Sequence, residues 1–301
     1  MTGDDAARRL AGDGLVLDLG AMRVRVRSPL PDLPEPLARV YRHLAPGDDD
    51  GFVDCEVDLL PARSLRRPWR PGVRFLADGT EPFSPLPHGM SLPQLEWGLN
   101  WVFAHLATRH LLLHAGALEH DGRGLLLVAG PGSGKSTLTA GLALDGMRLL
   151  SDEFGVLRLA DGSLLPMPRP VSLKNASIAL IAARPGDPLI GPVFHRTHKG
   201  DVAHLAPSPE AIRRRHEPVR PALIVFPSWR SGGPLELVPV RPARALAELA
   251  ANSCNYGVLG SAAFAAAADL VAGCACWRLT FGSLDEAIAR LRALCAANGV
   301  A

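Results

Sequence analysis

Residues 129–137, with the sequence Ala-Gly-Pro-Gly-Ser-Gly-Lys-Ser-Thr, have the residue types and spacing of a phosphate-binding loop. The glycines let the backbone bend so that several N–H groups converge on one anion. A helix predicted to begin after the bend adds partial positive charge there. Lys135 would neutralise the β- and γ-phosphates of ATP, and the Ser136 hydroxyl would hold Mg²⁺. The predicted nucleotide-binding residues are Gly130, Pro131, Gly132, Ser133, Gly134, Lys135, Ser136 and Thr137.

The strict form of this motif begins with Gly where the chain has Ala129, and a looser form accepts Ala. The alternative interpretation is a glycine-rich turn that binds no ligand. The phosphate loop is favoured because an apolar run at residues 124–129 predicts a buried strand before the bend. Leu138 and Leu142 also predict a helix with an apolar face after it.

Two acids, Asp152 and Glu153, stand at the end of the next predicted strand, which begins at Arg148. Open α/β sheets bind their ligands at the carboxyl ends of their strands. One carboxylate can hold Mg²⁺, which prefers oxygen ligands, and the other can accept the proton of an attacking hydroxyl. The alternative, a solvated acidic turn, is disfavoured by the phosphate loop that precedes it.

The segment from residue 113 to residue 153 resembles the catalytic domain of HPr kinase/phosphorylase, and more closely the bacterial HPr-kinase-related kinases. That family has a His before a Gly-Lys-Ser loop, a helix that ends near a Gly, and a strand that ends in two acids. In this chain these features are His114, Lys135-Ser136, Gly146 and Asp152-Glu153. The resemblance covers roughly residues 111–301 and is specific in the first third of that stretch. It implies a fold akin to the ATP-binding part of phosphoenolpyruvate carboxykinase.

The resemblance implies that Asp152 transfers the proton, that Glu153 and Ser136 serve Mg²⁺, and that His114 orients the reacting groups. A His after an apolar strand is otherwise more typical of a core residue. The family's Glu-Ile-Arg-Gly-rich strand is not found, and residues 170–175, Pro-Val-Ser-Leu-Lys-Asn, look like the signature of the related kinase group. The resemblance therefore does not extend to phosphorylase activity or to HPr as the acceptor.

Other basic residues are candidates for a secondary role. Lys174 could be a second cation for the transferring phosphoryl group, or a surface lysine. His195, Arg196, His198 and Lys199 lie in a Gly- and Pro-bounded stretch, residues 186–200. That stretch could be a lid that brings positive charge over the γ-phosphate or grips an acidic substrate, or a solvated basic loop.

The elements that position these residues favour an α/β fold in two parts. Residues 1–90 predict a β-rich accessory domain, with strands near residues 15–19, 22–26 and 53–60 and a solvated loop tip at residues 48–51. A linking helix, residues 91–110, is predicted to begin at Ser91 in a capping box with Gln94. Residues 111–301 alternate strands and helices, which is typical of an α/β layer structure. The resemblance implies that this stretch is a P-loop kinase domain. A last helix is predicted from Ser283 to Asn298-Gly299.

Composition narrows the class of protein further. The chain has 301 residues and a formal net charge of +2, without a concentrated basic stripe, which argues against nucleic acid as a partner. No apolar stretch is long enough to span a membrane. Five scattered cysteines and the lack of an apolar leader favour reduced, mostly core thiols in a cytoplasmic protein.

These features predict an ATP- and Mg²⁺-dependent kinase that phosphorylates a hydroxyl, with a serine of a protein or peptide as the first choice of acceptor. The alternatives are a kinase for a small hydroxylated molecule, a non-catalytic ATP-binding regulator and a hydrolysis-coupled ATPase. The family's oligomeric assembly makes a homo-oligomer a further expectation.

Overall fold

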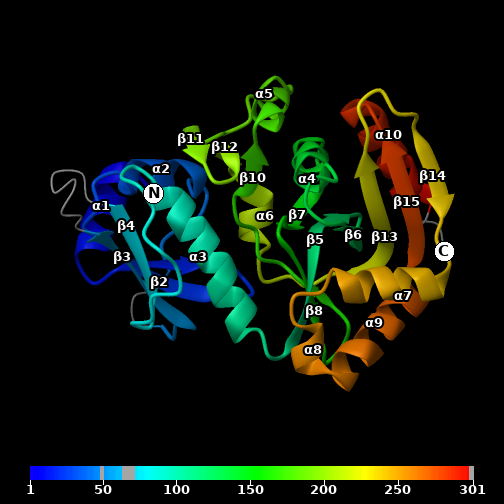
Figure 1. Ribbon diagram of the computed structural model, residues 1–301, viewed down its shortest axis with the longest axis horizontal. Coiled ribbons are helices and arrows are strands. Elements are labelled where there is room, and N and C mark those ends of the chain that lie inside the picture. Colours follow the sequence, from blue (N-terminus) through cyan, green and yellow to red (C-terminus); the bar gives the residue numbers. More distant parts are fainter. Residues whose placement is uncertain (48–50, 63–71, 298–301) are drawn as a thin grey trace.

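The computed structural model describes residues 1–47, 51–62 and 72–297. The chain is a mixed α/β protein with three β-sheets in this part, and the first and last described helices, Gly3–Ala11 and Leu284–Ala297, lie toward opposite sides of the molecule (Figure 1). The predicted loop tip at residues 48–50 and the predicted helix end at Asn298-Gly299 lie outside the described residues. Among the described helices, none is both long and apolar enough to cross a lipid bilayer.

The N-terminal half is built on a four-stranded sheet in the order β1-β2-β3-β4. Three of its strands, β2 to β4, alternate buried with more exposed residues, because one face packs on a core while the other faces outward. The strand predictions are confirmed, whereas the first helix had not been predicted. The elements of this half are α1 (Gly3–Ala11), β1 (Leu15–Asp18), β2 (Arg23–Arg27), α2 (Pro34–Val40), β3 (Cys55–Ala62), β4 (Gly72–Ala77) and α3 (Ser91–Leu106).

Helix α3 lies within the predicted linking segment, residues 91–110, and packs into the hydrophobic core of the N-terminal half. Its Leu95 and Leu99 are fully buried, and Gly98 lets the helix approach β4, since a Cβ there would lie 2.0 Å from the Phe75 ring. The predicted capping box is wrong. The helix is capped at Met90, and the Ser91 hydroxyl instead donates a hydrogen bond to Asp32 at 2.8 Å.

The large sheet has the order β14-β15-β13-β6-β5-β8-β9, and β7 also pairs with β5. Strands β6, β13 and β15 run parallel, whereas β5 is antiparallel to β6, β7 and β8. Its strands are β5 (His110–His120), β6 (Arg123–Val128), β7 (Arg148–Ser151), β8 (Phe154–Arg158), β9 (Leu164–Leu165), β13 (Arg220–Trp229), β14 (Glu236–Pro239) and β15 (Ala275–Phe281).

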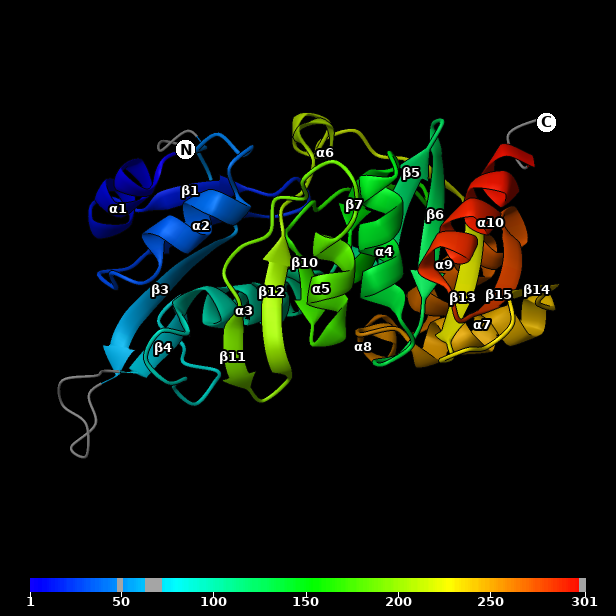
Figure 2. The same cartoon turned by 90° about the horizontal axis from the view of Figure 1, so that it is seen from above.

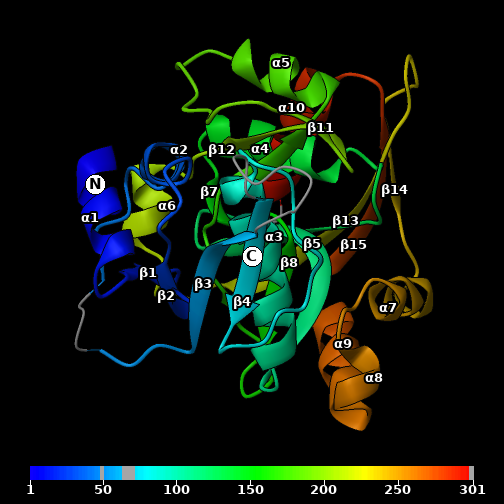
Figure 3. The ribbon, with the colours of Figure 1, turned by 60° about the vertical axis from the view of Figure 1, so that its left-hand side comes forward.

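Helices cover both faces of the large sheet. Alternate residues of β6 join two cores: Leu125 and Leu127 pack with α4 (Lys135–Leu144) and α10 (Leu284–Ala297), while Leu126 and Val128 pack with α7 (Pro242–Ala251) and α9 (Ser261–Gly273). Figure 3 shows α7 and α9, with the short α8 (Tyr256–Leu259), gathered away from α4 and α10. A central strand covered on both faces explains the continuous apolar run in the sequence.

A three-stranded sheet, in the order β10-β12-β11, stands between the N-terminal half and α4 (Figure 2). Sequence reasoning did not anticipate this sheet. Its strands and neighbouring helices are β10 (Val171–Lys174), α5 (Ala176–Ala182), β11 (Phe194–Thr197), β12 (Gly200–Leu205) and α6 (Pro209–Arg213).

Candidate functional site

The large sheet brings three of the predicted site segments together around the middle of strand β5. Strands β6 and β7 both lie antiparallel to β5, with Val128 opposite Ala115 and Ser151 opposite Ala117. The chain leaves β6 into the glycine-rich bend and leaves β7 into the two acids, so both segments emerge beside the middle of β5. His114, next to Ala115, is paired with Phe154 on the other side of β5. The predicted clustering of the phosphate loop, the acids and His114 therefore follows from strand register.

The bend itself is open toward solvent. Gly132 and Gly134 have φ of 83° and 84°, a conformation that favours glycine. A Cβ added at Gly130 or Gly132 would meet nothing within 4 Å. Helix α4 begins directly after the bend, and no side chain of the described residues caps its first turn. Its first N–H groups therefore face the concave side of the loop, where an anion can satisfy them.

The far side of the bend is fixed to the sheet. The Trp229 N–H donates a hydrogen bond to the Ser133 carbonyl at 2.9 Å, which ties the loop to the end of β13. A Cβ at Gly134 would lie 2.8 Å from the Trp229 Cβ, so this glycine is needed for close packing as well as for its φ. The loop is thus held in shape from behind while its concave side stays accessible.

Lys135 joins the glycine-rich bend to the segment that carries the two acids. Its side chain is buried, and the Nζ donates a hydrogen bond to the Asp152 carbonyl at 2.8 Å. Close packing of α4 on β5 sets this position, because a Cβ at Gly116 would lie 2.1 Å from the Thr139 hydroxyl oxygen. The packing role of Gly116 is visible only in the structure.

The Asp152 carboxyl is buried, with 4% of the residue exposed. Burial raises its pKa above the ordinary value, and Glu153 adds to the rise, against the opposing effect of Lys135 and the Ser136 hydroxyl. Within the described part of the chain, neither carboxylate oxygen accepts a hydrogen bond of normal geometry, although Ser136 is near enough to influence the pKa. A buried, poorly satisfied carboxyl with a raised pKa has the character of a proton acceptor.

Glu153 and His114 form the more accessible side of the site. His114 Nε2 lies 3.8 Å from Glu153 Oε2, and each side chain is about one-third exposed or less. Burial and the Lys135 charge lower the pKa of His114, so the imidazole is neutral at pH 7. Burial alone would raise the pKa of Glu153, but the charges of Lys135 and Lys174 outweigh it and the pKa is lowered. The Glu153 carboxylate is therefore ionised, and its oxygens can bind a cation.

Two further lysines reach the site from the three-stranded sheet. Lys174 ends β10, and its charge lowers the pKa values of both acids' carboxyls. Lys199, at the turn between β11 and β12, also lowers the pKa of Glu153. His195 and Arg196 are exposed and bond to Asp201 instead. Only part of the predicted basic lid thus faces the acids.

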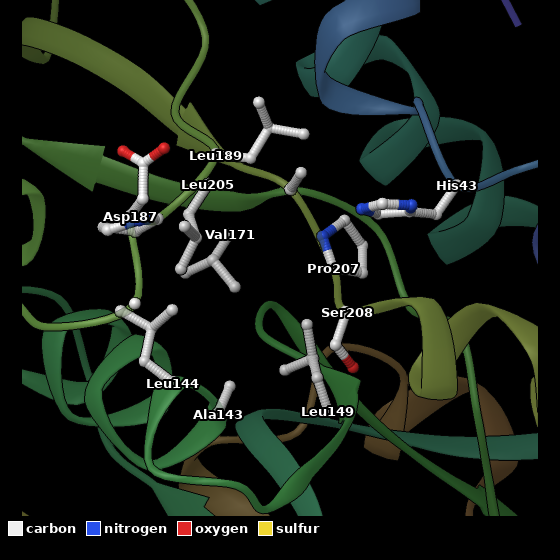
Figure 4. Close-up of a pocket in the computed structure, with 13 residues that line it drawn as sticks. His43, Ala143, Leu144, Leu149, Val171, Asp187, Leu189, Leu205, Pro207 and Ser208 are labelled. Carbon is white, nitrogen blue, oxygen red and sulfur yellow. The ribbon is translucent and has the colours of Figure 1, made fainter.

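A cavity of about 180 Å³ lies elsewhere, at the C-terminal end of α4. Its lining is largely apolar, and Figure 4 shows His43 and Asp187 on opposite sides of it. Since α4 has ten residues, the cavity is about 15 Å from the phosphate loop and belongs to a different region.

The five cysteines are all free thiols. Cys55 and Cys276 are buried, as predicted for core thiols, whereas Cys254 is exposed. The charges of Glu153 and Lys135 influence its pKa, which places this thiol near the candidate site.

The described side chains include no group of three or more His, Cys, Asp or Glu that could hold a metal ion by themselves. A Mg²⁺ ion here would depend on phosphate oxygens in addition to Ser136 and Glu153. The chain matches no known protein-family model, and no curated protein matches it. The function of this site must therefore be argued from its geometry and charge.

Proposed function

We propose that the protein is an ATP-dependent kinase, with a P-loop kinase domain of the HPr-kinase type in its C-terminal part. It transfers the γ-phosphoryl group of Mg-ATP to a hydroxyl, with a serine of a protein or peptide as the expected acceptor. The observation that carries the proposal is the Asp152 carboxyl. It is buried and has a raised pKa, and the backbone carbonyl of the same residue accepts a hydrogen bond from Lys135 of an open glycine-rich bend.

The described residues fit a Mg-triphosphate. The Ser136 hydroxyl and the ionised Glu153 carboxylate supply oxygen ligands of the kind that Mg²⁺ prefers. Bound Mg²⁺ would neutralise charge on the phosphates. The N–H groups at the start of α4 and the Lys135 ammonium bind the phosphates from the other side.

Asp152 removes the proton of the acceptor. As the acceptor oxygen forms its bond to the γ-phosphorus, the bond from that phosphorus to the bridging oxygen breaks and ADP leaves. The acceptor proton moves to the Asp152 carboxylate. The raised pKa lies closer to the working pH, which makes the Asp152 carboxylate a better proton acceptor. His114, neutral and beside Glu153, is placed to orient the reacting groups.

A non-catalytic nucleotide sensor is less favoured. Such a protein needs Lys135 and Ser136 but has no use for a buried carboxyl whose oxygens lack normal hydrogen bonds among the described residues. Groups of that kind cost about 1–3 kcal/mol of stability. A destabilising carboxyl beside a phosphate loop is expected where the carboxyl takes part in catalysis, so Asp152 favours a kinase over a sensor.

The test is transfer of labelled phosphate from [γ-³²P]ATP to a panel of serine, threonine and tyrosine peptides and hydroxylated metabolites, with products identified by mass spectrometry. Lys135→Met should abolish transfer and weaken ATP binding. Asp152→Asn should keep ATP binding but lower transfer by about 10²–10⁴-fold. Asp161→Asn, at an exposed acid, is the matched control. Near-normal turnover in Asp152→Asn would remove the proton-acceptor role, and release of free phosphate without any acceptor would favour an ATPase.

A further inference from the structure

The turn between β11 and β12 contacts the N-terminal half through the indole ring of Trp97. The Lys199 Nζ lies 4.8 Å from the centroid of the Trp97 ring, and the His198 ring packs edge-on against the same indole at 4.5 Å. Trp97 belongs to α3, so a residue of the N-terminal half contacts a lysine whose charge reaches Glu153. An ammonium over an aromatic face is attracted by the ring quadrupole.

The turn that carries Lys199 is fixed in shape. The Lys199 N–H donates to the Thr197 hydroxyl at 3.0 Å, and that hydroxyl donates to the Gly200 carbonyl at 2.7 Å. Gly200 has φ of 85° and leaves no room for a Cβ, which would lie 2.3 Å from the Asn175 side chain. The turn is therefore a set conformation rather than a loose loop.

The same turn is bonded to the strand end that carries Lys174. The Asn175 N–H donates to the Asp201 carbonyl at 2.9 Å, and the Asp201 N–H donates to Asn175 Oδ1 at 3.1 Å. Asn175 follows Lys174 directly. Burial and the Lys174 charge lower the pKa of Lys199, whereas Glu153 raises it. Two lysines are thus held near one another, and the charges of both lower the pKa of the partly exposed Glu153 carboxylate.

Helix α3 is anchored at the residue before Trp97. The buried Glu96 carboxylate accepts hydrogen bonds from Arg169 at 2.6 Å and from the Tyr41 hydroxyl at 2.7 Å. Arg169 lies in the segment that leads into β10. The position of Trp97 relative to the second half of the chain is therefore set by a buried ion pair.

We infer that Trp97 is a positioning residue that holds Lys199 toward the phosphate loop, where Lys199 supplies a second side-chain cation to the γ-phosphate of bound ATP. This inference rests on the proposed function. Charge in phosphoryl transfer is spread over the outer oxygens of the moving group, so a cation beyond the loop lysine is useful there. Two neighbouring lysines repel one another in the absence of an anion, and a phosphate between them removes that cost.

The test compares the affinities of Mg-AMPPNP and Mg-ADP, measured by isothermal titration calorimetry, because only the first has a γ-phosphate. Lys199→Met should weaken Mg-AMPPNP by about tenfold or more and Mg-ADP by less than about twofold, since a charge-assisted hydrogen bond is worth about one decade in Kd. Trp97→Ala should act in the same direction, and Trp97→Phe should restore most of the affinity by keeping an aromatic face. In a Lys199→Met background, Trp97→Ala should cause no further loss, because both act through one contact.

Arg196→Met is the matched control, because it removes an exposed cation from the same hairpin and should leave both affinities unchanged. Thermal melts by circular dichroism check that each variant is folded, and Lys199→Met keeps the test decisive where Trp97→Ala does not fold. Equal losses for both nucleotides, or no loss in Lys199→Met, would overturn this inference alone and assign Lys199 to the acceptor or to solvent. If the wild-type protein binds neither nucleotide, the proposed function fails and the inference falls with it.

Discussion

Substitution of Arg169 by Ala should be among the most destabilising single changes in this chain. Its guanidinium donates to the Glu96 carboxylate at 2.6 Å, to the Glu96 carbonyl at 2.7 Å and to Asn100 Oδ1 at 2.6 Å. Both members of the ion pair are less than one-tenth exposed. Loss of the guanidinium leaves the Glu96 carboxylate buried, with the Tyr41 hydroxyl as its remaining side-chain donor among the described residues. Breaking a buried pair in this way costs about 3–5 kcal/mol.

The assay is urea unfolding followed by far-ultraviolet circular dichroism and by tryptophan fluorescence, which also shows whether the two halves unfold together. With an m-value of about 2–3 kcal/mol per molar urea, the midpoint should fall by about 1–2 M. Arg158→Ala breaks an exposed pair with Asp161 and should cost about 1 kcal/mol or less. Replacement of both partners, Arg169→Met with Glu96→Leu, should recover most of the loss.

A cost below about 1 kcal/mol for Arg169→Ala would refute this reasoning. It would mean that water reaches Glu96 and that the pair does not fix α3 against the second half. The positioning role of Trp97 would then lose its anchor.

Three further predictions concern packing and titration. Gly116→Ala should destabilise by about 1–3 kcal/mol in chemical unfolding, because its Cβ meets the Thr139 hydroxyl, and a second change, Thr139→Ala, should recover part of the loss. Burial lowers the pKa of His204, so the native state holds it neutral and stability is lost as the pH falls below about 6.5; His204→Gln should flatten the change in Tm between pH 7.5 and 5.5. Burial raises the pKa of Asp152, so stability is lost as the pH rises above about 4, and Asp152→Asn should have a higher Tm than wild type at pH 7 and an equal one at pH 3.5.

Local sequence was sufficient to locate the glycine-rich bend between strand and helix and the two acids after the next strand. The bend and the strands before and after it lie within one short stretch of chain, so their residue pattern can be recognised without knowledge of distant contacts. The strand ends meet because β6 and β7 flank the same strand β5. Register of this kind follows from hydrophobic pattern and connection length, which the sequence displays.

Contacts between distant segments were not predictable in the same way. Lys199 was recognised as part of a basic stretch, but its partner Trp97 lies on a helix of the other half. Arg215 and His216 both pair with Asp18 of β1, nearly 200 residues away in the chain. Ser91 matched a local capping rule and instead bonds to Asp32. In each case tertiary packing supplied a partner that outcompeted the local one, and one sequence contains no information on which distant pair will meet.

The most direct test of the central claim is a crystal structure of the protein with Mg-AMPPNP. The account predicts the triphosphate in the bend at residues 130–134, with the Lys135 Nζ within about 3 Å of a phosphate oxygen and Asp152 facing the γ-phosphate. A nucleotide bound in the cavity at the far end of α4, or Asp152 turned away from the γ-phosphate, would contradict it.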